Sequence, residues 1–365
     1  MDIKTINHKQ FYHMKKNIQW AGLLIFIIMV CATSCSQNKQ NTYWNMKGVV
    51  LTINDLRTID WVSIAAKNGI NTIGTHIRPN EVMQFITSEQ GKAFLKMCKE
   101  HNIHVEHQLH AMGELLPRRL YAEDSTLFRM NEKGRRVPDF NCCVHSEKAL
   151  SIIEENALSV AKVLQPTNHR YYFWLDDGKP TCSCPKCSSY SPSEQALIIE
   201  NRILKKLKNI DPQAMLAHLA YENTLEAPKK VKPEEGIFLE FAPIWRTWSK
   251  PLTDLEATPL LENAEYMTHA DNLKYLEDNL RIFPVETAVV LEYWLDVSLF
   301  SRWKKPAVKL PWNKTIFESD LSTYAKYGLK NITTFAVYMD STYFKNYPDP
   351  SYLKEYGEGF NKINK

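Results

Sequence analysis

Hydrophobic and polar positions follow a repeating order along most of the chain, in which short apolar runs alternate with amphipathic stretches. Short apolar runs bounded by turn residues are typical of strands buried on both faces, and apolar residues at three- and four-residue spacing are typical of helices. The runs predicted as strands cover 47–54, 70–77, 103–110, 171–177, 214–221, 236–242, 287–294 and 331–338.

Amphipathic patterns that predict helices separate these strands. They cover 55–68, part of 80–102, 147–164 and 191–210, and further helical patterns follow the last three strands. Strands and helices that alternate over 46–365 predict an α/β fold, a single (β/α)8 TIM barrel. An open doubly wound sheet is the structural alternative, but residues 53–56 lack the Gly-rich phosphate loop that usually follows its first strand.

The N-terminal segment has the features of an export signal. Lys15 and Lys16 precede the apolar run 21–30, which is too short for a comfortable membrane span. The sequence A-T-S-C then resembles a bacterial lipobox, whose cysteine, here Cys35, is lipidated and becomes the mature N-terminus. We expect a signal peptide over 1–35, a polar tether over 36–45 and the barrel over 46–365. An uncleaved anchor helix is the alternative.

This leader predicts a folded domain outside the cytoplasm of a Gram-negative bacterium, facing the periplasm or on the cell surface and attached to the membrane by lipid alone. The 365 residues carry a net charge of +4, which gives no indication of nucleic-acid binding. Nine Trp, seventeen Tyr and fifteen Phe suit ring-shaped ligands that stack on flat side chains. A glycan or oligosaccharide is therefore the expected partner.

Charged and aromatic residues gather at the predicted strand ends, where barrels of this kind build their ligand sites. The aromatic run that begins at Tyr171 stops on two adjacent carboxylates, Asp176 and Asp177. Because neighbouring residues of a strand point to opposite faces, we expect only one of the two to face the ligand. Other strand ends contribute Glu106, Glu240, Tyr293, Asp296 and Tyr338.

Carboxylates, histidines and aromatic residues at one rim are the mixture that glycoside hydrolysis requires. Asp177, supported by Asp176, is the expected proton donor to the leaving oxygen. Glu292 or Glu222 is the expected second carboxyl, and no cofactor is required for this chemistry. The expected substrate-binding side chains are His76, Arg78, His107, His110, Tyr221, Trp245, Trp294 and Asp340.

A group of cysteines flanks the acidic pair, including a C-x-C-x-x-C motif directly behind it. Of the eight cysteines, Cys31 and Cys35 fall in the leader, and Cys98 lies in an apolar helical context as a free thiol. The remaining five fit a structural Zn site, or two disulfides with one spare thiol. Either arrangement would fasten the loop after the fourth strand to the segment before the third helix. The five are Cys142, Cys143, Cys182, Cys184 and Cys187.

Several motifs resemble those of a known family. They are F-R-M-N at 128–131, G-R-R at 134–136, N-C at 141–142, W-L-D-D at 174–177, C-S-C-P-K-C at 182–187 and L-A-Y at 219–221. On these motifs, 127–338 resembles the exported proteins grouped as domain-of-unknown-function family 4838, often lipoproteins of polysaccharide-degrading bacteria. That family is similar to glycoside hydrolase barrels, including β-N-acetylhexosaminidases and α-glucuronidases.

The resemblance implies a role for the acidic pair. In hexosaminidases an Asp-Glu pair ends the fourth strand, where the Glu is the acid and the Asp steers the acetamido group of the substrate. Here Asp177 takes the place of that Glu with a side chain one methylene shorter. A hydrolase acting on glycosidic bonds is the first hypothesis, and a non-catalytic glycan-binding lipoprotein is the alternative.

A metal-dependent hydrolase is a third hypothesis. It would use His76, His107, His110 and Asp340, although the chain lacks the His-x-His motif that follows the first strand in many metallo-barrels.

Overall fold

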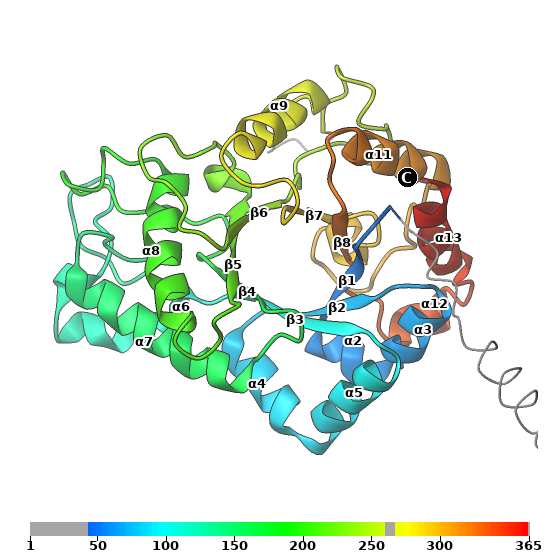
Figure 1. Cartoon of the computed structure of the whole chain (residues 1–365), viewed down its shortest axis with the longest axis horizontal. Helices are drawn as coiled ribbons and strands as arrows, with labels where there is room; N and C mark the ends of the chain where they lie inside the picture. The colour runs from blue at the N-terminus through cyan, green and yellow to red at the C-terminus, as the bar shows by residue number, and fades with distance from the viewer. Residues whose placement is uncertain (1–42, 260–266, 364–365) are drawn as a thin grey trace, which may run out of the picture. The chain divides into compact units, whose positions relative to one another are not determined.

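The computed structural model describes residues 43–259 and 267–363, in which eight parallel strands close into one barrel. Each strand pairs with the next along the chain, and β8 pairs with β1 (Figure 1). The predicted (β/α)8 TIM barrel is therefore confirmed, whereas the predicted signal peptide and its Cys35 lie outside the described residues. The strands are β1 (Met46–Thr52), β2 (Thr72–His76), β3 (His104–His110), β4 (Arg170–Trp174), β5 (Met215–Ala220), β6 (Ile237–Phe241), β7 (Val289–Glu292) and β8 (Asn331–Phe335).

Helices surround the ring of strands (Figure 1). None of those in the described residues is long and apolar enough to cross a membrane. The α-helices are α2 (Ile53–Thr58), α3 (Trp61–Lys67), α4 (Pro79–Thr87), α5 (Glu89–Glu100), α6 (Met112–Leu115), α7 (Glu147–Val163), α8 (Pro192–Leu207), α9 (His269–Leu280), α10 (Val297–Phe300), α11 (Lys314–Lys326), α12 (Ser341–Asn346) and α13 (Ser351–Gly359). The 3-10 helices are η2 (Arg118–Ala122), η3 (Ser125–Leu127), η4 (Glu222–Thr224) and η5 (Phe360–Lys362).

Two of the predicted helices are each divided by a capping residue. The pattern over 55–68 forms α2 and α3, because the Asp60 side chain accepts the backbone N–H of Ser63 and starts a new helix. The pattern over 80–102 forms α4 and α5, because Ser88 ends the first and caps the second through the N–H of Gly91. Such side-chain caps satisfy N–H groups that a helix start leaves without partners.

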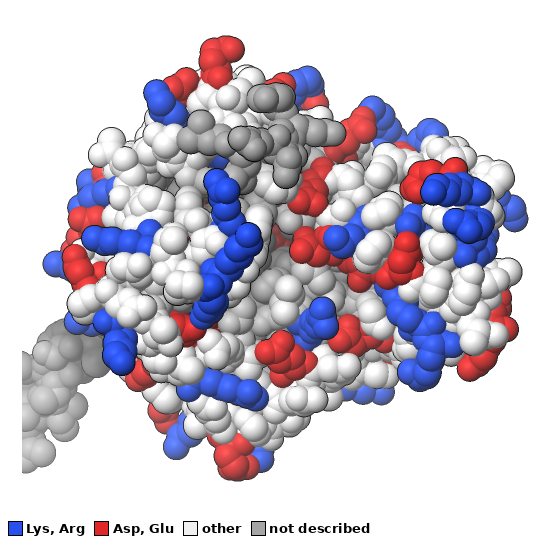
Figure 2. Space-filling model, turned by 180° about the vertical axis from the view of Figure 1, so that it is seen from behind, with Lys and Arg blue, Asp and Glu red and all other residues white. Residues whose placement is uncertain are grey.

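Side chains of the strands alternate between the barrel interior and the layer under the helices. In β4, Tyr172 and Trp174 join the interior cluster, whereas Tyr171 and Phe173 pack in the layer between strands and helices. This division explains why the fourth strand is aromatic throughout: both of its faces are buried. Basic and acidic side chains lie around a recess on the face shown in Figure 2.

Helix α13 packs closely against the end of α3, and a glycine makes this approach possible. A Cβ added at Gly357 would lie 1.8 Å from the carbonyl oxygen of Asn68. We expect Gly357→Ala to lower the free energy of unfolding by about 1–3 kcal/mol, the usual cost of overpacking. Gly113→Ala in α6 is the control, because its added Cβ meets nothing within 4 Å. The free energy of unfolding is measured in urea. Equal values for the two variants would contradict the close packing.

Candidate functional site

A cavity of about 510 Å³ opens at the C-terminal ends of the strands. Trp174, Tyr293 and Phe335, which belong to the interior cluster, form part of its lining. Tyr221 and Trp245, both predicted as ligand-contacting residues, line it as well. The cavity therefore offers flat apolar surfaces of the kind that bind sugar rings.

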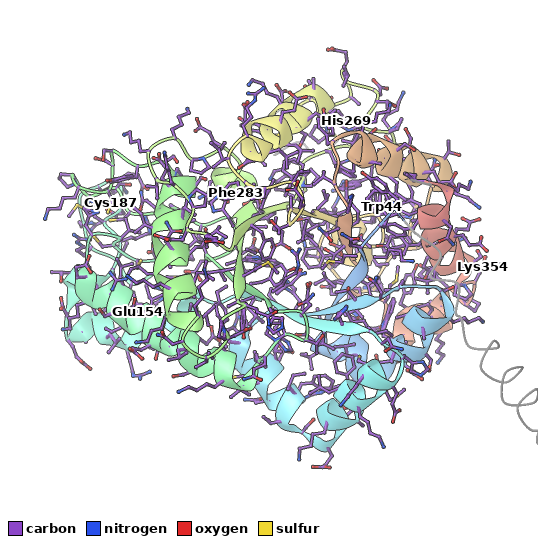
Figure 3. All side chains as sticks on the ribbon, in the orientation of Figure 1. Trp44, Glu154, Cys187, His269, Phe283 and Lys354 are labelled. Carbon is purple, nitrogen blue, oxygen red and sulfur yellow. The ribbon has the colours of Figure 1, made fainter. Side chains whose placement is uncertain are left out.

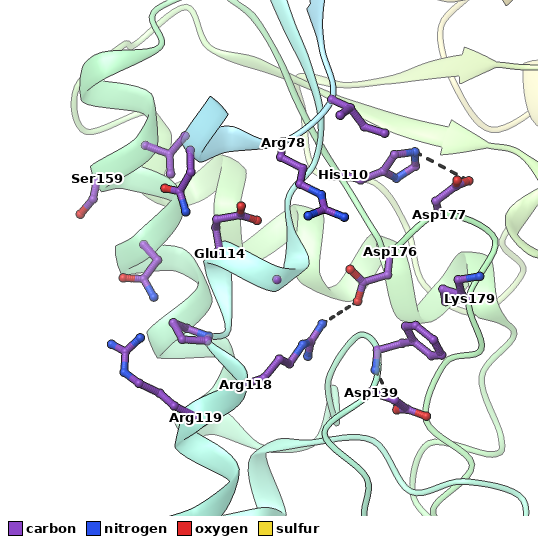
Figure 4. Close-up of a pocket in the computed structure, with 17 residues that line it drawn as sticks. Arg78, His110, Glu114, Arg118, Arg119, Asp139, Ser159, Asp176, Asp177 and Lys179 are labelled. Atoms are coloured by element: carbon purple, nitrogen blue, oxygen red, sulfur yellow. Dashed lines mark hydrogen bonds and ion pairs between the residues drawn. The ribbon is translucent and has the colours of Figure 1, made fainter. Parts of the chain in front are cut away.

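Asp177 lines this cavity, and two neighbours contact its carboxylate. The Tyr221 hydroxyl donates to Oδ1 at 3.0 Å, and His110 Nε2 lies 3.8 Å from the same oxygen. The side chain nevertheless remains 57% exposed, so a ligand can reach it. His110 Nδ1 donates to the carbonyl oxygen of Leu175 at 2.7 Å, which turns Nε2 toward Asp177 (Figure 4).

Glu222 brings a second carboxyl to the same cavity. Glu222 opens η4, two residues after the end of β5, and its backbone φ of 45° is uncommon outside glycine. Gly178 leaves room for its side chain, since a Cβ there would lie 1.8 Å from Glu222 Oε2. Burial raises the pKa of the Glu222 carboxyl, and the negative charge of Asp177 raises it further.

Asp176 points away from Asp177, as strand alternation predicts (Figure 4). Its Oδ2 accepts hydrogen bonds from Arg118 Nη2 and from the backbone N–H of Asn141, both at 2.6 Å. The Asp176 N–H donates in turn to Asn141 Oδ1 at 2.9 Å. Asp176 is therefore held in protein contacts that position the loop, and it supports Asp177 without entering the first cavity.

A second cavity of about 730 Å³ adjoins the first on the side of α6 and α7 (Figure 4). Ile77, His110, Asp177 and Lys179 line both cavities. Arg78, predicted as a ligand-binding residue, lines only the second. Asp177 thus stands at the boundary between an aromatic cavity and a more polar one.

His76 lies in the aromatic cavity with its ring 5.8 Å from that of Trp174, measured between centroids. Its Nδ1 donates to the carbonyl oxygen of Gln108 at 2.8 Å, which leaves Nε2 as an acceptor. Burial lowers the pKa of His76 to about 3, and the neighbouring His110 lowers it as well. The imidazole is therefore neutral at physiological pH.

Glu292 does not reach the cavity, contrary to its expected role as second carboxyl. It is fully buried and accepts hydrogen bonds from Arg246 and from the Tyr324 hydroxyl in α11. Arg246 also pairs with the buried carboxylate of Asp320 at 2.7 Å. Glu292 is therefore paired in the layer under the helices, where a buried carboxylate needs such partners.

Trp294 also lies behind the barrel wall, contrary to its expected role as a sugar-contacting residue. Its Nε1 donates to Asp320 Oδ2 at 3.0 Å, and its ring packs against Phe317. Alternation explains both corrections: Leu291 and Tyr293 line the cavity, so the residues between and after them face α11.

His107 and Asp340 lie away from the cavity too. His107 Nδ1 lies 2.8 Å from the Thr75 hydroxyl, and the side chain lines a separate groove beside α5. Asp340 caps α12 through the N–H of Tyr343 and pairs with Lys305. The four ligands of the metal-dependent hypothesis are therefore not gathered at one place.

Four buried cysteines converge beside the loop after β4: Cys143, Cys182, Cys184 and Cys187. Their sulfur atoms lie within 4.8 Å of one another, and Cys143 Sγ is 3.9 Å from Cys184 Sγ and 3.8 Å from Cys187 Sγ. Four thiolates around a tetrahedral Zn²⁺ at about 2.3 Å stand about 3.8 Å apart. A disulfide would need about 2.05 Å.

The surroundings of the cluster also suit thiolates. The Met130 backbone N–H donates to Cys182 Sγ at 3.2 Å, and Arg136 Nη1 lies 3.7 Å from the same sulfur. Cys142 is buried but stays outside the cluster, so the structure selects Cys143 as the fourth member. Figure 3 shows Cys187 among the loops beside α8, outside the ring of strands.

A Ser-His-Glu arrangement lies between α8 and β5. His218 Nε2 is 3.0 Å from the Ser193 hydroxyl, and its Nδ1 is 2.7 Å from Glu200 Oε2. All three side chains are buried, and the Phe283 ring stacks on the imidazole. The buried hydroxyl is not accessible to a ligand. The two hydrogen bonds instead join α8 to β5 and so hold the helix on the barrel.

The sequence placed Asp296 at a strand end without giving it a role and did not indicate Trp303, although both line the aromatic cavity. Burial raises the pKa of Asp296 to about 6, while its Oδ1 caps α10 through the N–H of Ser298. Its place after β7 was a signal for it. Trp303 is 52% exposed in the loop after α10, where no periodic pattern indicates a site.

A family model described as Domain of unknown function (DUF4838) matches residues 54–356. The chain belongs to the DUF4838 family. The expected family resemblance is thus confirmed. No curated protein matches the chain.

Among solved structures, the DUF4838 barrel is similar to a β-N-acetylhexosaminidase from Bacteroides fragilis NCTC 9343. The TM-score is 0.52 at 11% identity, over 87% of this chain and 65% of that one, so the chain spans just under two thirds of that protein. A glycoside hydrolase family 20 β-N-acetylglucosaminidase gives 0.47 at 7% identity, over 87% and 70%. A GH18 chitinase from Pseudoalteromonas aurantia gives 0.47 at 9%, over 87% and 99%. At these identities the similarity shows the fold alone.

Proposed function

We propose that this DUF4838 protein hydrolyses glycosidic bonds with Asp177 and Glu222 as its two carboxyl groups. The observation that carries the proposal is their shared position on one aromatic cavity at the C-terminal ends of the strands. Glycoside hydrolysis requires a protonated carboxyl that donates to the leaving oxygen and an ionised carboxyl that acts as nucleophile or as base for water. The glycoside hydrolase fold of the solved neighbour supports this chemistry.

The two carboxyls lie in different environments. Glu222 is the half-buried member, and burial together with the charge of Asp177 raises its pKa. Asp177 is more exposed, and the Tyr221 hydroxyl donates a hydrogen bond to it. We therefore assign the proton to Glu222 and the ionised role to Asp177, which reverses the order that the sequence suggested.

Aromatic side chains hold the sugar in this proposal. Tyr221 and Trp245 keep the roles that the sequence predicted, and Trp303 takes the place of Trp294. Because Trp303 is half exposed at the cavity, it offers a stacking surface that water covers in the free protein.

The carboxyl assignment predicts the effect of isosteric amides. Asp177→Asn and Glu222→Gln should each lower kcat/KM on a glycoside turned over by the wild type by about 10²–10⁴-fold. At alkaline pH, kcat/KM should fall as Glu222 loses its proton. Glu226→Gln is the matched control, because Glu226 is exposed on the same loop and pairs with Lys229.

A panel of aryl glycosides and polysaccharides, with residues 36–365 as the enzyme, provides this test. Wild-type rates in either amide variant would contradict the assignment. Glycan binding without turnover by the wild type would instead favour the non-catalytic glycan-binding alternative.

We also propose that the four-cysteine cluster binds a structural Zn²⁺. The support is the spacing of the sulfur atoms and the N–H groups directed at Cys182. Hydrogen bonds from Cys182 and Cys187 lower the pKa of Cys143, the direction that favours a metal-binding thiolate. The metal would tie 143 to 182–187 and so brace the loop that carries Asp177.

Metal analysis of the purified protein should find one Zn²⁺ per chain. Cys184→Ser should lose it and should cost about 2–5 kcal/mol of stability, comparable to the loss of a native cross-link. Cys142→Ser is the matched control, since it removes a buried thiol next to Cys143 that lies outside the cluster. A metal-free wild type, or a mass lower by the hydrogens of two disulfides, would contradict the proposal.

Export and lipid anchoring remain a proposal based on the sequence before the barrel. The apolar run 21–30 and the lipobox-like A-T-S-C support cleavage before Cys35 and attachment to a membrane by lipid. In a bacterial host the protein should partition with membranes, and Cys35→Ala should abolish lipidation. Unchanged processing of that variant would contradict the anchor.

A further inference from the structure

The second cavity presents basic side chains that the protein does not pair. Arg78, Arg119 and Lys179 line it and are exposed, and within 43–259 and 267–363 none of them forms an ion pair. Lys179 instead rests with Nζ 5.3 Å from the centre of the Phe140 ring. These cations are therefore available to a ligand.

Two of the four acidic residues that line the second cavity are paired with arginines. Asp176 pairs with Arg118 at 2.6 Å, and Asp139 pairs with Arg129, also at 2.6 Å. Glu114 lies near Arg78, and burial raises the pKa of its carboxyl. Figure 4 shows the Arg78 guanidinium reaching into the cavity between Glu114 and Asp176.

The position of Asp177 relates this cavity to the proposed reaction. Asp177 and His110 line both cavities, so a glycosidic bond cleaved at Asp177 has one sugar in each. The aromatic cavity suits the face of a sugar ring, whereas the second cavity offers charged donors. The two sugars that flank the bond therefore contact different side chains, aromatic on one side and charged on the other.

We propose that the ligand is an acidic oligosaccharide whose carboxylate- or sulfate-bearing unit occupies the second cavity. Arg78 binds the acidic group through its planar guanidinium fork, which matches both anions, and Lys179 adds a point charge near the cleaved bond. Arg119, whose guanidinium points away from Arg78 in Figure 4, offers a fork to an acidic group farther along the glycan. The location of that bond rests on the proposed function, but the preference for acidic glycans does not require turnover.

The test is binding of Asp177→Asn protein, which leaves the glycan intact, to an array of neutral, uronate-containing and sulfated oligosaccharides. Acidic glycans should be retained over neutral ones of the same backbone, and binding should weaken as salt rises. Adding Arg78→Ala and Arg119→Ala should raise Kd at least about tenfold, since each lost charge-assisted contact contributes about that factor. Arg135→Ala, at an exposed arginine outside the cavity, should leave Kd unchanged.

Retention of uronates or of sulfated glycans identifies which anion the cavity takes. Neutral glycans bound as tightly as acidic ones, an unchanged Kd in the double arginine variant, or no retention of any acidic glycan would each overturn the proposal. Arginine-dependent binding without wild-type hydrolysis would leave it standing and remove the hydrolase. Hydrolysis of neutral glycans that does not depend on the arginines would overturn the acidic-ligand proposal and leave the hydrolase standing.

Discussion

Asp176 and Asn141 form two reciprocal hydrogen bonds, in which the side-chain oxygen of each residue accepts the backbone N–H of the other, and the geometry of the site depends on this contact. Arg118 donates to the same carboxylate, and Asn141 Nδ2 also donates to the carbonyls of Lys179 and Pro180. The loop after β4 is thereby fixed to the segment before α7. Asp177 follows Asp176 directly, so its backbone is held while its carboxylate stays free for a ligand.

The cysteine cluster begins two residues after Asn141, at Cys143, and closes on the far side of the same loop. The cysteine cluster and the Asp176 contacts both hold the loop after β4. The binding free energy of a metal at the cluster would therefore stabilise the same loop. The side chain of Glu222, whose backbone φ is positive, occupies the space that Gly178 leaves beside Asp177. The two carboxyls are thus brought together by a rigid loop and a local close approach, and their mutual repulsion favours keeping one proton.

The sequence was sufficient for the barrel and for part of the site. Parallel strands buried on both faces appear as continuous apolar runs, which is why all eight were recognisable. The same continuity hides which residues face inward: the run 289–291 is apolar without alternation, so Glu292 and Trp294 after it were assigned to the wrong face. Trp303 lies in an irregular loop, and the choice of Cys143 over Cys142 depends on contacts between distant segments. These features follow from tertiary packing, which a local pattern does not contain.

The central claim is that Asp177 and Glu222 form an interacting pair in which Glu222 holds the proton. Titration of the Glu222 side-chain carboxyl carbon by NMR tests it without a substrate. The pKa of Glu222 should lie above the ordinary glutamate value of about 4.3, and it should fall in Asp177→Asn because the neighbouring charge is gone. A Glu222 pKa at or below the ordinary value, or one that Asp177→Asn leaves unchanged, would contradict the account.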